Sequence, residues 1–168
     1  MPDDDENDLW PSEIMVNVLS PLMILRQQAE IISKRTQGIV IGDVRISFIG
    51  ADLKELCFDV IASAIGHRQR GLTARYPHDV PYPTLLMADV FAQDKFPSPF
   101  DESLDQKHWH LQSDAEVARS RIAYSPSQFK GLLREIFNSS GTISILLSLI
   151  ARSNELASQS LVSSEPVK

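Results

Sequence analysis

The sequence predicts an α+β fold: an N-terminal helix, an antiparallel meander sheet of three to five strands, and two or three C-terminal helices packed on one sheet face. Three or four strand-like runs follow one another over residues 39–91 without a helix between them. Segments 21–37 and 113–152, on either side, have helical patterns. Short connections favour antiparallel pairing, and the apolar face of such a sheet needs helices to cover it.

The first helix is predicted over residues 21–37. The Ser20 hydroxyl is placed to cap its start, and Pro21 is already restricted to helical φ. Gly38 suits the left-handed position that follows a helix end. The apolar residues that fall on one helical face are Leu22, Leu25, Ala29 and Ile32.

Period-two patterns predict the sheet. Apolar and polar residues alternate over 39–49 and again over 53–65, and the short 50–52 link predicts a hairpin. Residues 66–71 are predicted to form a second loop and 72–76 a short third strand. Three prolines exclude a regular central strand over 77–83, and extended structure resumes at 84–91.

The C-terminal part divides into a long aperiodic segment and a helical region. Residues 93–112 show no periodicity, and so long an irregular segment is often functional or disordered. Ser113 with Glu116 and Ser125 with Gln128 match helix-capping boxes, and the last helix is predicted to fade near Asn154. We therefore expect a tail at 1–8, one domain at 9–157 and a second tail at 158–168.

Composition bounds the class of protein. Cys57 is the single cysteine, which excludes an internal disulfide and a multi-cysteine metal site. No signal-peptide pattern and no apolar run of about 20 residues is present, so we expect a cytoplasmic protein with no membrane contact. The order of elements is similar to that of many small bacterial proteins.

The net charge of -6 is concentrated at the N-terminus. Five of the 22 acidic residues lie within the first nine positions, and the other 17 nearly balance 16 Lys and Arg. A near-neutral body lacks the basic excess of a duplex-DNA binder, so we do not expect a nucleic-acid partner.

The sharpest local pattern is a pair of histidines separated by a tryptophan. In an extended backbone, His108 and His110 would project to the same side and could meet one metal ion, with Glu116, Asp101 or Asp105 as an oxygen ligand. The alternative is that both are surface histidines in a loop.

Three further groups carry candidate chemistry, each with a structural alternative. His67, Arg68, Arg70 and Arg75 form the only basic cluster, either an anion or partner contact or a solvated loop. Tyr76 and Tyr82 each precede a proline, and either present rings to a partner or stiffen a crossover. Cys57 is either a nucleophile with His67 or His78 as its base, or a packed thiol.

The leading functional hypothesis is a non-enzymatic interaction or regulatory domain that binds another protein or its own copy and needs no cofactor. No dinucleotide-binding, P-loop, nucleophile-elbow or HExxH motif occurs. One alternative is a small metal-dependent or acid–base enzyme that uses the 93–112 loop. Another is a small-ligand sensor with a pocket between helices and sheet.

Overall fold

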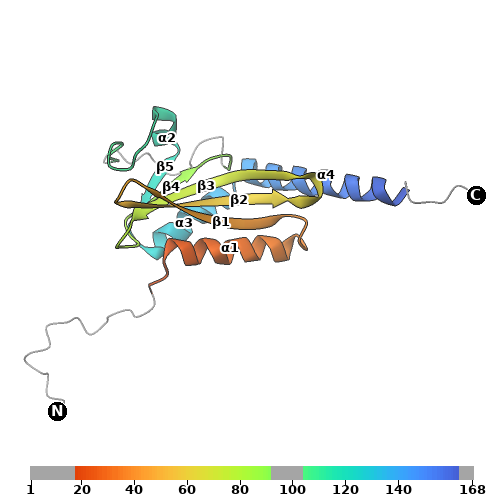
Figure 1. Ribbon diagram of the computed structural model, residues 1–168, viewed down its shortest axis with the longest axis horizontal. Coiled ribbons are helices and arrows are strands. Elements are labelled where there is room, and N and C mark those ends of the chain that lie inside the picture. Colours follow the sequence, from red (N-terminus) through yellow and green to blue (C-terminus); the bar gives the residue numbers. More distant parts are fainter. Residues whose placement is uncertain (1–17, 92–103, 163–168) are drawn as a thin grey trace, which may run out of the picture.

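The computed structural model describes residues 18–91 and 104–162, and it has the predicted α+β architecture (Figure 1). Helix α1 (Pro21–Arg35) precedes a five-stranded sheet, and helices α3 and α4 follow it. The elements in chain order are α1, β1 (Ile41–Ile49), β2 (Leu53–Ala62), the 3-10 turn η1 (Ser63–Ile65), β3 (His67–Pro77), β4 (Thr84–Ala88), α2 (Asp114–Ala118), β5 (Ser120–Ala123), α3 (Pro126–Phe137) and α4 (Ser140–Val162).

The sheet is a complete antiparallel meander in the order β1-β2-β3-β4-β5. Val44 of β1 pairs with Phe58 of β2, and Phe58 pairs with Leu72 of β3. The register of β2 and β3 shifts between Phe58 and Asp59, where Gly71 is left over as a bulge. The Gly71 carbonyl accepts the amides of Asp89 and Phe91, which ties the end of β4 back to this bulge.

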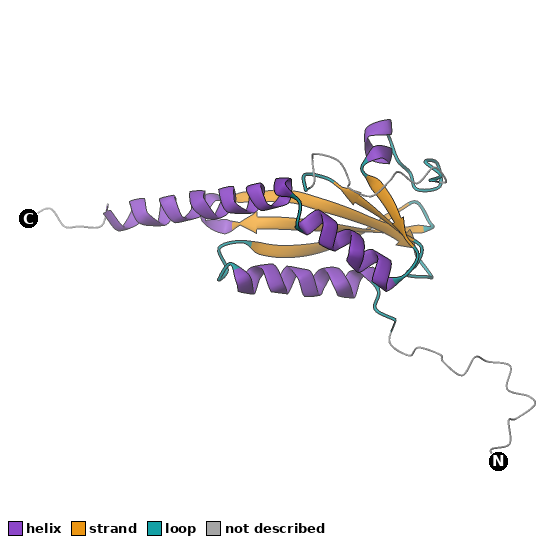
Figure 2. Cartoon of the chain, turned by 180° about the vertical axis from the view of Figure 1, so that it is seen from behind, coloured by secondary structure: helices purple, strands orange, loops and turns teal. Residues whose placement is uncertain are grey.

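Helices α1, α3 and α4 cover one face of the sheet, which we call the inner face (Figure 2). The predicted caps of α1 and α3 are present: Ser20 Oγ accepts the Met23 amide at 3.3 Å and Ser125 Oγ accepts the Gln128 amide at 3.2 Å. Helix α1 lies so close to β1 that a Cβ added to Gly42 would stand 2.5 Å from the Ala29 Cα. The largest fully buried side chains are Phe58, Phe91, Phe129, Ile24, Leu25, Leu56, Leu72, Leu85, Leu86, Ile136, Val40 and Val60.

A second, smaller apolar cluster joins the β4 end of the sheet to the segment that leads into α2. Its buried members are Leu53, Leu85, Met87, Trp109 and Leu111. The segment from Leu104 to Leu111 therefore adds a small layer to the fold. The predicted aperiodic segment 93–112 falls partly outside the described residues, since the structure describes it only from residue 104.

Two strand predictions were wrong. Residues 67–71 were predicted to be loop but belong to β3, because residues 67–70 pair with residues 59–62 of β2 and this pairing outweighs their polar character. Strand β5 lies inside the region predicted to be helical, because pairing with β4 outweighs the helical signal around Ile122. The capping box at Ser113 is real, but the helix it starts, α2, ends at Ala118.

Helix α4 was predicted to fade near Asn154 but continues to Val162, so residues 158–162 are helical and not tail. Its C-terminal part projects past the sheet in both ribbon views (Figures 1 and 2). Serine hydroxyls there bond to backbone carbonyls of the preceding turn, Ser158 to Asn154 and Ser160 to Leu156. In the parts of the chain that the structure describes, none of the helices combines the length and the hydropathy that a membrane crossing requires.

Candidate functional site

The side of the sheet opposite the three covering helices, which we call the outer face, carries an ion-pair network across β1, β2 and β3. Arg45 donates to Oδ2 of Asp59 from Nε at 2.8 Å and from Nη2 at 2.7 Å. Arg68 donates to the same oxygen from Nε at 2.7 Å and also pairs with Asp43. The Asp59 side chain is 1% exposed, and its Oδ1 accepts no hydrogen bond from any described residue. The network joins three strands and neutralises Arg68.

A second ion pair anchors the Trp109 segment to the sheet. Arg75 Nε donates to Glu55 Oε2 at 2.9 Å, and both side chains are largely buried. Arg75 Nη1 donates to the carbonyls of Trp109 at 2.9 Å and His110 at 3.0 Å. All these bonds are within the protein, so the Arg75 guanidinium binds this segment to the outer face and is not available to an external ligand.

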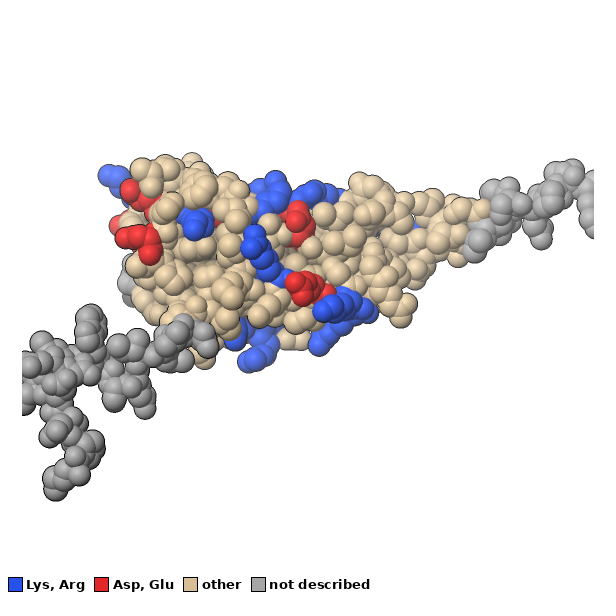
Figure 3. Space-filling model, turned by 60° about the horizontal axis from the view of Figure 1, so that its bottom comes forward, with Lys and Arg blue, Asp and Glu red and all other residues tan. Residues whose placement is uncertain are grey.

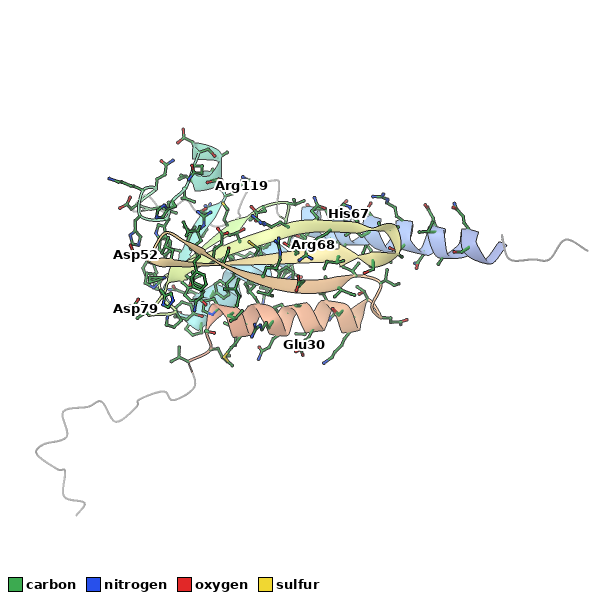
Figure 4. The ribbon with its side chains drawn as sticks, viewed as in Figure 1. Glu30, Asp52, His67, Arg68, Asp79 and Arg119 are labelled. Atoms are coloured by element: carbon green, nitrogen blue, oxygen red, sulfur yellow. The ribbon has the colours of Figure 1, made fainter. Side chains whose placement is uncertain are left out.

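The four side chains of the predicted basic cluster are therefore not gathered at one place, and the anion-contact role stays a prediction. They lie along β3, where successive side chains point to opposite faces, so His67 and Arg68 diverge (Figure 4). His67 Nε2 lies 3.2 Å from Gln69 Oε1. Within residues 18–91 and 104–162, Arg70 makes no hydrogen bond or ion pair and is the member of the cluster left to solvent.

The two candidate metal-binding histidines lie in a helical turn, so the premise of an extended backbone was wrong. Asp105 Oδ1 accepts the amides of Lys107 at 3.0 Å and His108 at 3.2 Å, which starts the turn. His110 takes φ of 52° as the left-handed residue that ends it. Trp109 is buried between two exposed histidines, and the His108 ring packs edge-on against it.

The proposed third ligand has another role. Glu116 Oε2 accepts the Gln112 amide at 2.6 Å at the start of α2, and Asp101 lies outside the described residues. Over the described parts of the chain, no three His, Cys, Asp or Glu side chains gather as a metal site. The metal hypothesis stays a prediction without a supporting ligand set.

Both candidate tyrosines face the protein interior. Tyr76 is buried, with Lys54 Nζ 5.4 Å from its ring centroid. Tyr82 packs edge-on against Phe129 and donates its hydroxyl to the Leu19 carbonyl at 3.0 Å. Burial raises the pKa of Tyr82 to about 12, so the hydroxyl stays a donor. These contacts favour the structural alternative for both residues.

A buried thiol, Cys57, and a half-buried carboxyl group, Asp89, lie on the outer face near Arg70. Burial raises the pKa of the Cys57 thiol, although the charge of Arg70 opposes the shift. Its described polar contact is Glu55 Oε1 at 3.8 Å, which cannot make it more nucleophilic. Burial also raises the pKa of Asp89, although Thr73 Oγ1 donates to Asp89 Oδ2 at 2.7 Å. This arrangement supports a packed thiol more than a catalytic one.

Two features remain available for binding, and the sequence analysis did not identify the residues that form either of them. One is a pocket of about 420 Å³ between α1, α3 and α4. The other is the second half of β1, an edge strand with exposed apolar side chains. The close spacing of two cations, Lys130 and Arg134, beside the apolar stripe of α3 is a signal in the sequence that could have indicated the lining of the pocket.

Comparison with known proteins adds no functional information. No protein-family model, curated protein or solved structure matches the chain.

Proposed function

We propose that the protein is a non-enzymatic interaction domain that associates with a second copy of itself through residues 44–48 of β1. The proposal rests on one observation: β1 is an edge strand of the sheet and carries exposed apolar side chains. Natural proteins usually protect such an edge against pairing with another chain. Ile46 is 43% exposed and Phe48 is 60% exposed, although both point to the inner face. We propose the cytoplasm as its compartment, because a single cysteine is typical of reducing surroundings.

The backbone of β1 supports the same surface. The Gly42 amide points away from β2 and donates to Ser33 Oγ at 3.2 Å, so α1 closes the first part of the edge. In an antiparallel ladder every second amide points the same way, which includes those of Val44, Ile46 and Phe48. None of these three amides has an outward hydrogen bond to a described residue. They are free to pair with another strand.

The side chains favour one register for pairing with a second copy. A twofold axis at Ile46 sets Ile46 against its own equivalent and Val44 against Phe48 of the second copy. On the outer face this register sets Arg45 against Ser47, whereas an axis at Arg45 would oppose two arginines. The apolar register avoids like-charge repulsion and gives an antiparallel dimer with a continuous sheet.

The molar mass in solution tests the proposal. We expect a dimer by light scattering across micromolar concentrations, and we expect Ile46→Lys to be monomeric because it opposes two lysines at the axis.

Leu147→Lys is the matched control, since Leu147 is 61% exposed on α4, away from β1. The part of the surface that α4 forms is almost free of charged side chains in Figure 3, so α4 is the strongest rival interface. A monomeric wild type, or a dimer broken by Leu147→Lys and not by Ile46→Lys, would overturn the proposal.

A further inference from the structure

We propose that the pocket between α1, α3 and α4 binds a small amphiphile that has a hydrocarbon body and a carboxylate head, such as a medium-chain fatty-acid anion. This site lies on the helical side of the molecule, and it is independent of the β1 edge. Its volume of about 420 Å³ falls within the roughly 300–1,000 Å³ typical of small-molecule sites.

The floor of the pocket is aromatic and reaches the core. Phe58 and Phe91 are buried, yet both line the pocket together with Phe137. The three ring centroids lie 5.7 to 6.4 Å from one another. A Cβ on Gly71 would stand 2.3 Å from the Phe91 ring, so this glycine allows the ring to lie directly on β3. The floor is therefore held in a fixed position.

The walls are aliphatic and come from all three helices. Ile24, Ile31 and Ile32 extend from α1, Leu133 from α3, and Leu146 and Ile150 from α4. Ile31 remains 40% exposed, which indicates that α1 and α4 do not close over the floor. Burial of a hydrocarbon chain between these walls would remove apolar surface from water, which drives binding.

The rim of the pocket is positively charged. Arg35 at the end of α1 and Lys130 and Arg134 on α3 line it, and none of the lining residues that the structure describes is acidic. Lys130 and Arg134 are one helical turn apart, so their charges repel. None of the three cations forms an ion pair with a residue that the structure describes. An anion at the rim would relieve this repulsion.

Three polar side chains that line the pocket already make hydrogen bonds within the protein, and Gln28 adds a fourth, uncharged polar group. Thr142 Oγ1 donates to the Ile136 carbonyl at 2.7 Å, and Thr36 Oγ1 donates to the Ile32 carbonyl at 2.9 Å. Asn138 Nδ2 donates to the Arg134 carbonyl at 2.7 Å. The cations at the rim are the lining groups that favour an anionic head, and an arginine fork suits a carboxylate because it can donate two parallel hydrogen bonds.

The charge and shape of the pocket select among ligand classes. A cationic amphiphile would meet three positive charges and no carboxylate among the described lining residues. A small anion without a hydrocarbon body would leave the aromatic floor in contact with water. A neutral alcohol would leave the positive charge of the rim without a counter-charge. An anionic amphiphile satisfies both parts of the site.

Titration calorimetry on the full chain tests the proposal with decanoate below its micelle concentration, and with decanol, decyltrimethylammonium and acetate as comparison probes. We expect one decanoate per chain, at least tenfold weaker binding of decanol, and no heat from the other two. We expect Lys130→Gln with Arg134→Gln to weaken decanoate binding at least tenfold, because the variant removes two of the three rim cations.

Lys107→Gln is the matched control, since Lys107 is exposed in the Trp109 segment and is not a lining residue. It should bind decanoate as the wild type does, and so should Ile46→Lys, which separates this proposal from dimer formation. Equal binding of decanol and decanoate, several decanoate molecules per chain, or an unaffected double variant would overturn the proposal.

Discussion

At the scale of single residues, Asp59 is the acceptor on which the outer-face network depends. Its Oδ2 accepts both Arg45 and Arg68, while the two arginines remain about half exposed. A carboxylate that accepts hydrogen bonds from guanidinium groups stabilises the fold more than a neutral acceptor would, because hydrogen bonds between charged groups are stronger. Period-two alternation predicted that Asp59 and Arg45 would share a face. It did not predict their contact with Arg68, because β3 was predicted to begin after that residue.

We expect Asp59→Asn to lower the free energy of unfolding by about 1.5–3 kcal/mol, the range for hydrogen bonds to charged groups. The amide keeps the volume but removes the charge that two arginines share. Urea unfolding of the variant and the wild type measures the difference. Asp79→Asn is the matched control, because Asp79 is exposed at the opposite end of the sheet (Figure 4). Equal stabilities of Asp59→Asn and wild type would show that the network does not stabilise the sheet.

At the scale of elements, local signals predicted the helices better than the strands. Helices α1 and α3 begin where Ser-Pro pairs predict, because a cap is made by residues close in the chain. The first part of β3 and the whole of β5 depend on partners far along the chain, so their own residues carry little signal. Residues 67–70 are all polar, so the alternation that sends His67 and Gln69 to one face and Arg68 and Arg70 to the other leaves no apolar face to signal a strand.

The Trp109 segment shows how an irregular stretch becomes an element of the fold. Asp105 caps a single turn, Arg75 binds its carbonyls, and Trp109 packs with Leu85 and Met87. Position in the sequence suggested a functional loop. The contacts of its described part, from residue 104, indicate that Trp109 anchors a small layer on the outer face.

We expect Trp109→Ala to release this segment and to lower the free energy of unfolding by about 3–5 kcal/mol, the usual cost of removing a large buried aromatic side chain. Hydrogen exchange should become faster over residues 105–118 and stay slow in β2. Lys107→Ala, which shortens an exposed side chain in the same turn, should leave both measurements unchanged. Unchanged exchange over residues 105–118 in Trp109→Ala would contradict the anchoring role.

At the scale of the whole molecule, the two proposed binding surfaces arise from how the layers meet. Helix α1 covers β1 up to Gly42, and the remainder of the strand carries exposed Ile46 and Phe48. Between α1 and the α3–α4 pair the pocket stays open above Phe58 and Phe91. Neither feature was predictable in detail, because each depends on the distance between elements that are far apart in the chain. The α+β class itself was predictable because it follows from element order.

Disulfide trapping at the proposed twofold axis tests the central claim, that β1 pairs with β1 of a second copy, most directly. In a Cys57→Ala background, Ile46→Cys should oxidise to a covalent dimer, since facing residues in a hydrogen-bonded pair lie about 5.5 Å apart at Cα, within the reach of a disulfide. Arg45→Cys in the same background should form this dimer far more slowly. Rapid trapping through position 45, or none through position 46 in protein at dimer-forming concentration, would contradict the account.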